Sequence, residues 1–330
     1  CNPKPFPQWG FAVDAPRSMD ADGAAVAVHA TLDYWPNKSD EVALVNSVGV
    51  PSLPVASWQE DVAESRSALL PGQVVIVRDM GSPDSRDLPD ESALLEEFEY
   101  AAKSAQEAGA QIVELNLSCP NTARAGSPLI CQDAALSGKL VQRVSRALGP
   151  GTPLFIKISY LNSEALKSLV EACGPHVRGI TAINTMAVPV VDTQGESFFG
   201  EAREYAGLSG APLRTLARTV CRQLVDLSGP YGYQVVGVGG VTSPRDYKDL
   251  MDVGVAAVQS CTGAWLNPLL AFEVRAQYGV DQRDGYLSAV FVDEAIGELS
   301  RQVDAAILRR DDIPESAKLA IAGQRSTKNG

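Results

Sequence analysis

The feature that most restricts the fold of this chain is an alternation of short apolar runs with longer helical stretches. Eight runs have the aliphatic and β-branched composition of buried strands, at residues 11–13, 24–28, 74–77, 112–115, 154–158, 180–183, 235–238 and 256–258. Eight strands in βα alternation predict an α/β fold, a closed parallel (β/α)8 or TIM barrel, rather than an open doubly wound sheet. In such a barrel the chemistry lies at the carboxyl ends of the strands, so the residue after each run is a candidate site residue.

Helical stretches fill the gaps between the runs. Residues 91–109, 134–148 and 214–227 carry apolar side chains at helical spacing, and we assign them to the outer ring of the barrel. Residues 42–53 alternate apolar and small side chains, which predicts an added strand or hairpin across the C-terminal mouth of the barrel. The segment 186–205 is polar and dotted with glycine, and we expect it to form a long loop that caps the pocket.

Composition and charge narrow the class of protein. The chain has 330 residues, is 45% hydrophobic and has a formal net charge of -12. Its length suits one domain built on an α/β barrel of roughly 250 residues. The acidic balance argues against a nucleic-acid partner or an anionic membrane surface. No apolar run approaches the roughly 18 residues of a membrane span.

The cysteines argue against a metal centre. The six are scattered, at positions 1, 119, 131, 173, 221 and 261, without a C-x-x-C motif, and there are only two histidines. This pattern builds no zinc or iron-sulfur site and predicts reduced thiols in a cytoplasmic protein.

Polar side chains gather where the fourth apolar run ends, in the sequence N-L-S-C-P-N. Asn116 closes the strand, and Ser118, Cys119 and Asn121 follow it. Carboxamides carry both donors and acceptors, so a pair of them suits a planar ligand edge with alternating N–H and C=O groups. A thiol between them can act as a base or nucleophile if its thiolate is stabilised. Taken alone, these residues are equally compatible with a polar turn that contains a buried structural cysteine.

This hexapeptide after an apolar strand resembles the signature of the dihydroorotate dehydrogenase family, flavin enzymes on a (β/α)8 barrel. In the soluble class of that family, which the chain resembles most, the cysteine is the active-site base. The resemblance covers approximately residues 22–277, with residues 1–21 poorly matched and residues 278–330 forming a C-terminal helical extension that contains an amphipathic helix at 293–308. It implies one FMN-binding domain over residues 1–330, a homodimer, and a soluble electron acceptor such as fumarate.

Other segments extend the resemblance to the substrate site. N-S-V-G-V-P-S-L resembles the family's N-S-M-G-L-P-N, and Asn184 with Thr185 resembles the family's pair after the sixth strand. The implied substrate contacts are Asn46, the backbone of Val48, Gly49 and Val50, and the side chains of Asn116, Asn121, Asn184 and Thr185. Four asparagines in one pocket would be hard to satisfy without a polar ligand, which favours a pyrimidine-like small molecule. Without the other matches, Asn46 would be read as a hairpin turn residue.

Lys157 and two glycine-rich loops extend the resemblance to the cofactor. Lys157 lies inside an apolar strand, where an unpaired ammonium is costly, and the resemblance implies that it contacts the flavin edge that becomes negative on reduction. The alternative is a lysine whose head reaches solvent at the barrel's end. The other implied FMN contacts are Asn116, Ile183, Gly207, Ser209, Gly239, Gly240, Cys261, Thr262 and Gly263. The last five belong to loops resembling a phosphate site, with a helix expected to open near Ala264.

The activity that the resemblance implies is the oxidation of dihydroorotate to orotate in pyrimidine biosynthesis. Cys119 would remove a proton from C5 while hydride leaves C6 for the flavin, with Ser118 and Lys157 as the other catalytic residues. One departure keeps alternatives open, because Val28 or His29 stands where the family has a lysine at the end of the second strand. The alternatives are a related flavin oxidoreductase acting on another uracil-like or cyclic imide ring, and a non-catalytic paralogue.

Overall fold

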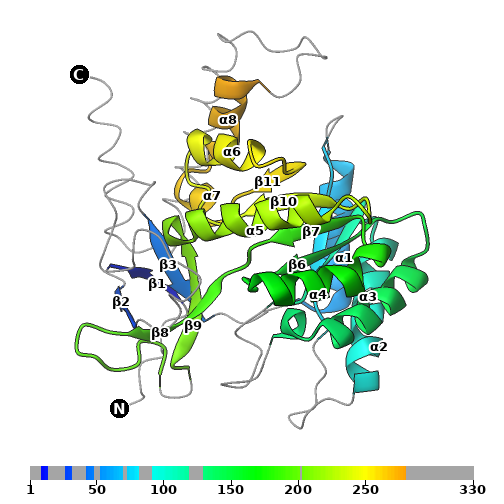
Figure 1. Cartoon of the computed structure of the whole chain (residues 1–330), viewed down its shortest axis with the longest axis horizontal. Coiled ribbons are helices and arrows are strands. Elements are labelled where there is room, and N and C mark those ends of the chain that lie inside the picture. Colours follow the sequence, from blue (N-terminus) through cyan, green and yellow to red (C-terminus); the bar gives the residue numbers. More distant parts are fainter. Residues whose placement is uncertain are drawn as a thin grey trace.

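Two sheets organise the protein (Figure 1). The structure is a computed structural model that describes residues 9–13, 27–31, 42–47, 53–69, 73–81, 91–118, 129–200 and 203–279. The first sheet is parallel throughout and has six strands in the order β11 (Ala257–Gln259), β10 (Gln234–Val238), β7 (Gly179–Ala182), β6 (Leu154–Ile158), β5 (Ile112–Asn116) and β4 (Ile76–Asp79). The strands therefore follow one another across the sheet in chain order, as they do in an α/β barrel.

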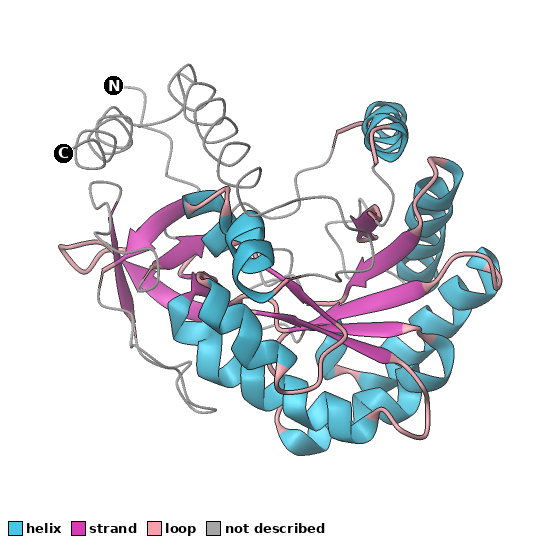
Figure 2. Ribbon diagram, turned by 90° about the horizontal axis from the view of Figure 1, so that it is seen from above, coloured by secondary structure: helices cyan, strands magenta, loops and turns pink. Residues whose placement is uncertain are grey.

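Helices separate the parallel strands and lie along one face of their sheet (Figure 2). They are α2 (Glu91–Glu107), α3 (Ala134–Leu148), α4 (Ser163–Cys173), α5 (Arg214–Leu227) and α6 (Pro244–Met251). The three predicted helices are confirmed as α2, α3 and α5. Asp133 caps α3 by accepting a hydrogen bond from Leu136 N, which explains why that helix begins where the apolar spacing begins. Within the described part of the chain, no helix is both long and apolar enough to cross a bilayer.

The remaining helical elements lie near the ends of the described segments or between strands and helices. They are α1 (Val55–Ser67), α7 (Thr262–Leu266), α8 (Leu270–Tyr278), and the short 3-10 helices η3 (Ile130–Gln132), η4 (Gly174–His176) and η5 (Ala211–Leu213). The amphipathic helix predicted at 293–308 lies outside the described residues.

The second sheet is a small closed barrel and corrects the predicted topology. Its order is β1 (Trp9–Ala12), β2 (Val28–Thr31), β8 (Met186–Val191), β9 (Tyr205–Gly210) and β3 (Ala43–Asn46). The prediction of eight parallel barrel strands therefore holds only in part for the described residues: six strands are parallel, but the first run overlaps β1 of the small barrel and the second run shares only Val28 with β2. β1 is antiparallel to both β2 and β3, and only β2 and β8 run parallel. Apolar runs locate strands, but they do not determine which strands pair.

Two predicted segments also belong to the small barrel. The strand expected within 42–53 is confirmed as β3, between β1 and β9. The capping loop expected at 186–205 is wrong, because β8 pairs antiparallel with β9, with Met186 opposite Leu208. The alternating burial of residues 186–191 explains this strand, since one of its faces turns toward the barrel's core. The small barrel joins the carboxyl edge of the parallel sheet, since β7 leads into β8 and Thr262, after β11, donates to Ser209 of β9 at 2.9 Å.

Gly210, at the end of β9, permits the close approach of two segments. Its φ is +93°, and a Cβ there would lie 2.2 Å from the carbonyl oxygen of Val42. We predict that Gly210→Ala lowers the free energy of unfolding by about 2 to 5 kcal/mol, from roughly 1–2 kcal/mol of backbone strain and roughly 1–3 kcal/mol of overpacking. Urea unfolding measures the change. Gly151→Ala is the matched control, because a Cβ at Gly151 meets nothing within 4 Å. Equal midpoints for the two variants would contradict the prediction.

Candidate active site

The carboxyl ends of three neighbouring parallel strands bring four predicted site residues together. Asn116 closes β5 and Asn184 follows β7, and Asn184 Nδ2 lies 3.2 Å from Asn116 Oδ1. The same amide nitrogen lies 3.2 Å from the carbonyl oxygen of Ser118 and 3.0 Å from its Oγ. Ser118 Oγ also donates to the carbonyl oxygen of Lys157, on β6, at 3.1 Å. These contacts fix the orientation of both carboxamides at the edge of the sheet.

Lys157 presents a buried cation to the same edge. It is in register with Asn116 on one side and Thr181 on the other, and 5% of its surface is exposed. Among the described residues, its ammonium makes no hydrogen bond or ion pair. Burial, followed by the charge of Arg78, lowers the pKa of Lys157, Glu114 and Cys261 act in the opposite direction, and the net pKa is about 8. An electron-rich ligand would offset the cost of this unpaired charge.

Glu114 is a buried charged residue that the sequence analysis missed. It is fully buried in β5, where Arg78 Nε contacts its Oε1 at 2.8 Å and Thr181 Oγ1 donates to its Oε2 at 2.5 Å. An acidic residue inside an apolar run was the available signal, since such a group requires partners. Asp79, next to Arg78, is different: its carboxyl oxygens are buried without a hydrogen-bond partner among the described residues, and burial raises its pKa.

The small barrel contributes the other described residues of the predicted substrate site. Asn46 ends β3 opposite Gly207 of β9, and its Nδ2 donates to the Gly207 carbonyl oxygen at 3.4 Å. Thr185 lies against Gly207, where an added Cβ would be 2.6 Å from Thr185 Oγ1. Ser209 Oγ donates to the carbonyl oxygen of Leu44 at 3.3 Å. Asn46, Thr185 and Gly207 are therefore neighbours, on the barrel that joins the edge holding Asn184.

The two glycine-rich loops after β10 and β11 also meet. Gly239 and Gly240 have φ values of +120° and +74°, and a Cβ on Gly240 would lie 2.6 Å from Arg214 Cα. Ser260 Oγ donates to the carbonyl oxygen of Val241 at 2.7 Å, which ties one loop to the other. A Cβ on Gly263 would lie 2.2 Å from that same carbonyl oxygen. The helix expected near Ala264 begins two residues earlier, as α7 at Thr262.

A salt bridge between Arg214 and Asp246 supports the loop that contains Gly239 and Gly240. Arg214 Nε lies 2.5 Å from Asp246 Oδ1 and 3.2 Å from the carbonyl oxygen of Gly240. Asp246 Oδ2 accepts from the backbone N–H of Thr242 at 3.0 Å. Ile183, buried beside Gly239, and the exposed Cys261 complete the described cofactor candidates. The loop conformation is therefore held by the protein itself.

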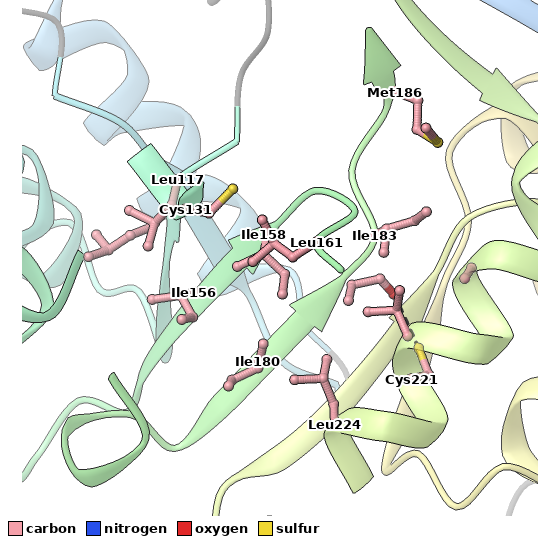
Figure 3. Packing of buried hydrophobic residues seen from close by; sticks show 14 of the residues in the cluster. Leu117, Cys131, Ile156, Ile158, Leu161, Ile180, Ile183, Met186, Cys221 and Leu224 are labelled. Carbon is pink, nitrogen blue, oxygen red and sulfur yellow. Dashed lines mark hydrogen bonds between the residues drawn. The ribbon is translucent and has the colours of Figure 1, made fainter. Parts of the chain in front are cut away.

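Buried apolar residues pack around the strands that carry the site residues (Figure 3). Ile158 and Ile183 are buried there, together with Cys131 and Cys221. Burial raises the pKa of Cys131 to about 11 and that of Cys221 to about 12, so both remain neutral thiols near pH 7. These thiols are packing residues rather than reactive groups.

Five predicted site residues lie outside the described residues. They are Cys119, Asn121, Val48, Gly49 and Val50. Ser118 is the last described residue before Cys119, and Ser47 is the last before Val48. The described segments 42–47 and 91–118 therefore each end directly before predicted site residues. The roles assigned to these five residues remain predictions.

Comparison with known proteins shows which protein family this chain resembles. A family model described as dihydroorotate dehydrogenase matches residues 36–277. The chain is 29% identical over 257 residues to dihydroorotate dehydrogenase of Dictyostelium discoideum, covering 74% of this chain and 66% of that protein. It is 30% identical over 202 residues to the catalytic subunit of dihydroorotate dehydrogenase B (NAD(+)) of Solidesulfovibrio magneticus, covering 59% and 64%. The aligned region thus spans just under two thirds of each relative.

A solved structure agrees with the fold. The crystal structure of DHODH from Eimeria tenella in complex with ferulenol superposes with a TM-score of 0.56 and 18% identity, covering 71% of this chain and 65% of that one. A parallel sheet with helices on one face and polar side chains at its carboxyl edge defines a protein of the α/β-barrel class, here with six parallel strands described. Because the family model matches more than half of the sequence, the chain belongs to the dihydroorotate dehydrogenase family.

Proposed function

We propose that this protein is an FMN-dependent oxidoreductase that oxidises dihydroorotate to orotate in pyrimidine biosynthesis. The observation that carries the proposal is the ammonium of Lys157, which is buried without a partner among the described residues and lies in register with Asn116. A fixed cation at this position suits the edge of a flavin, where reduction builds negative charge. Family membership and the names of the relatives support the same reaction.

The described residues fit FMN at both of its ends. Lys157 and Asn116 would contact the ring system, with Ile183, Gly207 and Ser209 around it. The loops containing Gly239, Gly240, Cys261, Thr262 and Gly263 would hold the phosphate. The two glycines with positive φ let the backbone approach a phosphate closely, and Arg214 holds one of them in place. FMN, when bound, supplies the hydride acceptor of the reaction.

The substrate would be bound by carboxamides and activated by a thiol. Asn46, Asn116, Asn121 and Asn184 would hold the ring together with Thr185, and the backbone amides of Val48, Gly49 and Val50 would hold its carboxylate. Cys119 would take the proton from C5, which is the role that the family resemblance assigns to it. Ser118, the residue before Cys119 in the sequence, is fixed to β6 through the Lys157 carbonyl oxygen.

A second candidate function follows from β2. The family's lysine at this place is replaced by Val28, which is buried, or by His29. Losing a cation weakens recognition of the substrate's carboxylate, so an uncharged uracil-like or cyclic imide ring is the alternative substrate. The remaining attributes are also proposals. A single FMN-binding domain rests on the family resemblance and the chain length, a cytoplasmic location on the cysteine pattern, and a homodimer and fumarate or a similar small molecule as electron acceptor on the family resemblance alone.

Absorbance spectroscopy tests the proposal directly. FMN is added to the 330-residue protein, unbound FMN is removed, and the flavin band is recorded before and after anaerobic addition of dihydroorotate. We predict that the band bleaches with dihydroorotate and persists with dihydrouracil. Bleaching with dihydrouracil alone would select the alternative substrate, and a protein that retains no flavin would support a non-catalytic paralogue.

A further inference from the structure

Three side chains on the parallel sheet form a network around the buried Glu114, which we call the Glu114 clamp; Glu114 and Thr181 are buried, and the Arg78 side chain is 43% exposed. It consists of Arg78 on β4, Glu114 on β5 and Thr181 on β7. Arg78 Nε lies 2.8 Å from Glu114 Oε1, and Thr181 Oγ1 donates to Glu114 Oε2 at 2.5 Å. Each carboxylate oxygen of Glu114 therefore already has a donor, and the residue is 0% exposed.

The Glu114 clamp spans β6, the strand that carries Lys157. β6 lies between β5 and β7 in the sheet, so the Glu114 carboxylate must extend across β6 to meet Thr181. Lys157 stands on β6 in register with Thr181, which places the carboxylate beside the lysine side chain. The two charges nevertheless form no ion pair within the described residues, and the only ion pair of Glu114 there is with Arg78.

We propose that Arg78 is a positioning residue that occupies Glu114 and so keeps the ammonium of Lys157 available to a ligand in the barrel. A buried carboxylate and a buried ammonium in neighbouring positions attract each other strongly, because little solvent screens them. Arg78 competes with Lys157 for the Glu114 carboxylate, because the Nε–H of its guanidinium already donates to that carboxylate. This inference rests on the proposed function, in which that ligand is FMN.

The charges around Lys157 support the assignment. The charged and titratable groups that act on it are Arg78 from β4, Glu114 from β5 and Cys261 after β11. Burial, followed by the repulsion of Arg78, brings the pKa of Lys157 to about 8. Removing Arg78 would end this repulsion and release Glu114, and both changes raise the pKa of Lys157.

The test follows the titration of Lys157 in the FMN-free 330-residue protein. NMR of protein labelled with carbon-13 lysine reports the pH midpoint, and the Lys157 signal is identified by its loss in Lys157→Met. The expected midpoint is about 8 in the wild type, moving toward the ordinary value of 10.5 in Arg78→Gln. Arg78→Lys, which retains a cation beside Glu114, is expected to return the midpoint toward the wild-type value.

A matched control separates the clamp from ion pairs in general. Arg143→Gln removes a comparable contact between two outer helices, where Arg143 Nε lies 2.5 Å from Glu99 Oε2, and it should leave the Lys157 midpoint unchanged. If Arg78→Gln does not fold, Thr181→Val frees one oxygen of Glu114 without removing a charge. That variant should also raise the midpoint, by a smaller amount.

FMN binding provides the second readout. Drawing Lys157 toward Glu114 removes one charge-assisted contact from the ligand, so Arg78→Gln should weaken FMN binding by about tenfold. An unchanged Lys157 midpoint in folded Arg78→Gln would overturn the inference. A shifted midpoint in a protein that binds no FMN would instead uphold the clamp and refute the proposed function, so the two failures are distinguishable.

Discussion

Replacing Cys119 with alanine is expected to leave FMN bound and to slow the reduction of the flavin by dihydroorotate by about 10²- to 10⁴-fold, the usual contribution of a positioned general base. The thiol follows directly after Ser118, whose hydroxyl is fixed to β6 at the carboxyl edge of the sheet. Removing the sulfur takes away the group assigned to accept the C5 proton, while the proposed FMN contacts remain. Stopped-flow absorbance after anaerobic mixing with dihydroorotate measures the rate.

Cys131→Ala is the matched control for this prediction. Cys131 lies in the next described segment, where its backbone N–H donates to the carbonyl oxygen of Leu117 at 2.9 Å. Burial raises the pKa of its thiol to about 11, so it is neutral at the pH of the assay and its loss should leave the rate of flavin reduction unchanged. An undiminished rate in Cys119→Ala would remove the assignment of Cys119 as the base.

The sequence located the strands better than it located their partners. The run predicted at 154–158 coincides with β6, and those at 112–115 and 235–238 differ from β5 and β10 by one residue at one end. Apolar composition is a local property, so it survives without knowledge of the fold. The pairing of β1 with β3, which sets Trp9 opposite Asn46, depends on contacts between distant segments. No local pattern in the sequence distinguishes this pairing from a parallel one.

The same distinction explains which site residues could be predicted. Asn116, Lys157 and Asn184 come at or near the ends of successive parallel strands, and such ends necessarily share one edge of a sheet. The contact between Glu114 and Thr181 crosses the intervening strand and depends on register and on the reach of a side chain. Arg78 directly follows the third apolar run, but no local pattern in the sequence identifies Glu114 as its partner.

Lys157→Met is expected to stabilise the FMN-free protein at neutral pH. The pKa of Lys157 is about 8 in the folded protein and 10.5 in an ordinary environment, a difference equivalent to about 3 kcal/mol. Below pH 8 the ammonium is charged in both states, so the folded state carries the whole cost of burying it. Between pH 8 and 10.5 the folded protein releases the proton first and the cost declines; above 10.5 it is absent. Removing the amine should therefore raise the unfolding free energy by about 3 kcal/mol at pH 7 and by little above pH 10.5.

Urea unfolding over a pH series measures this difference, with Lys167→Met as the control. Lys167 lies on α4 with 66% of its side chain exposed. Its replacement should therefore produce no gain in unfolding free energy that declines as the pH rises. The opposite effect is expected on function, because losing the cation at the flavin edge should slow flavin reduction by about 10²-fold or more. A gain in stability with a loss of rate would mean that the chain keeps a costly buried charge because its ligand needs it. No gain at pH 7 would mean that Lys157 is already neutral or paired in the folded protein, and the electrostatic argument for a flavin at this edge would fail.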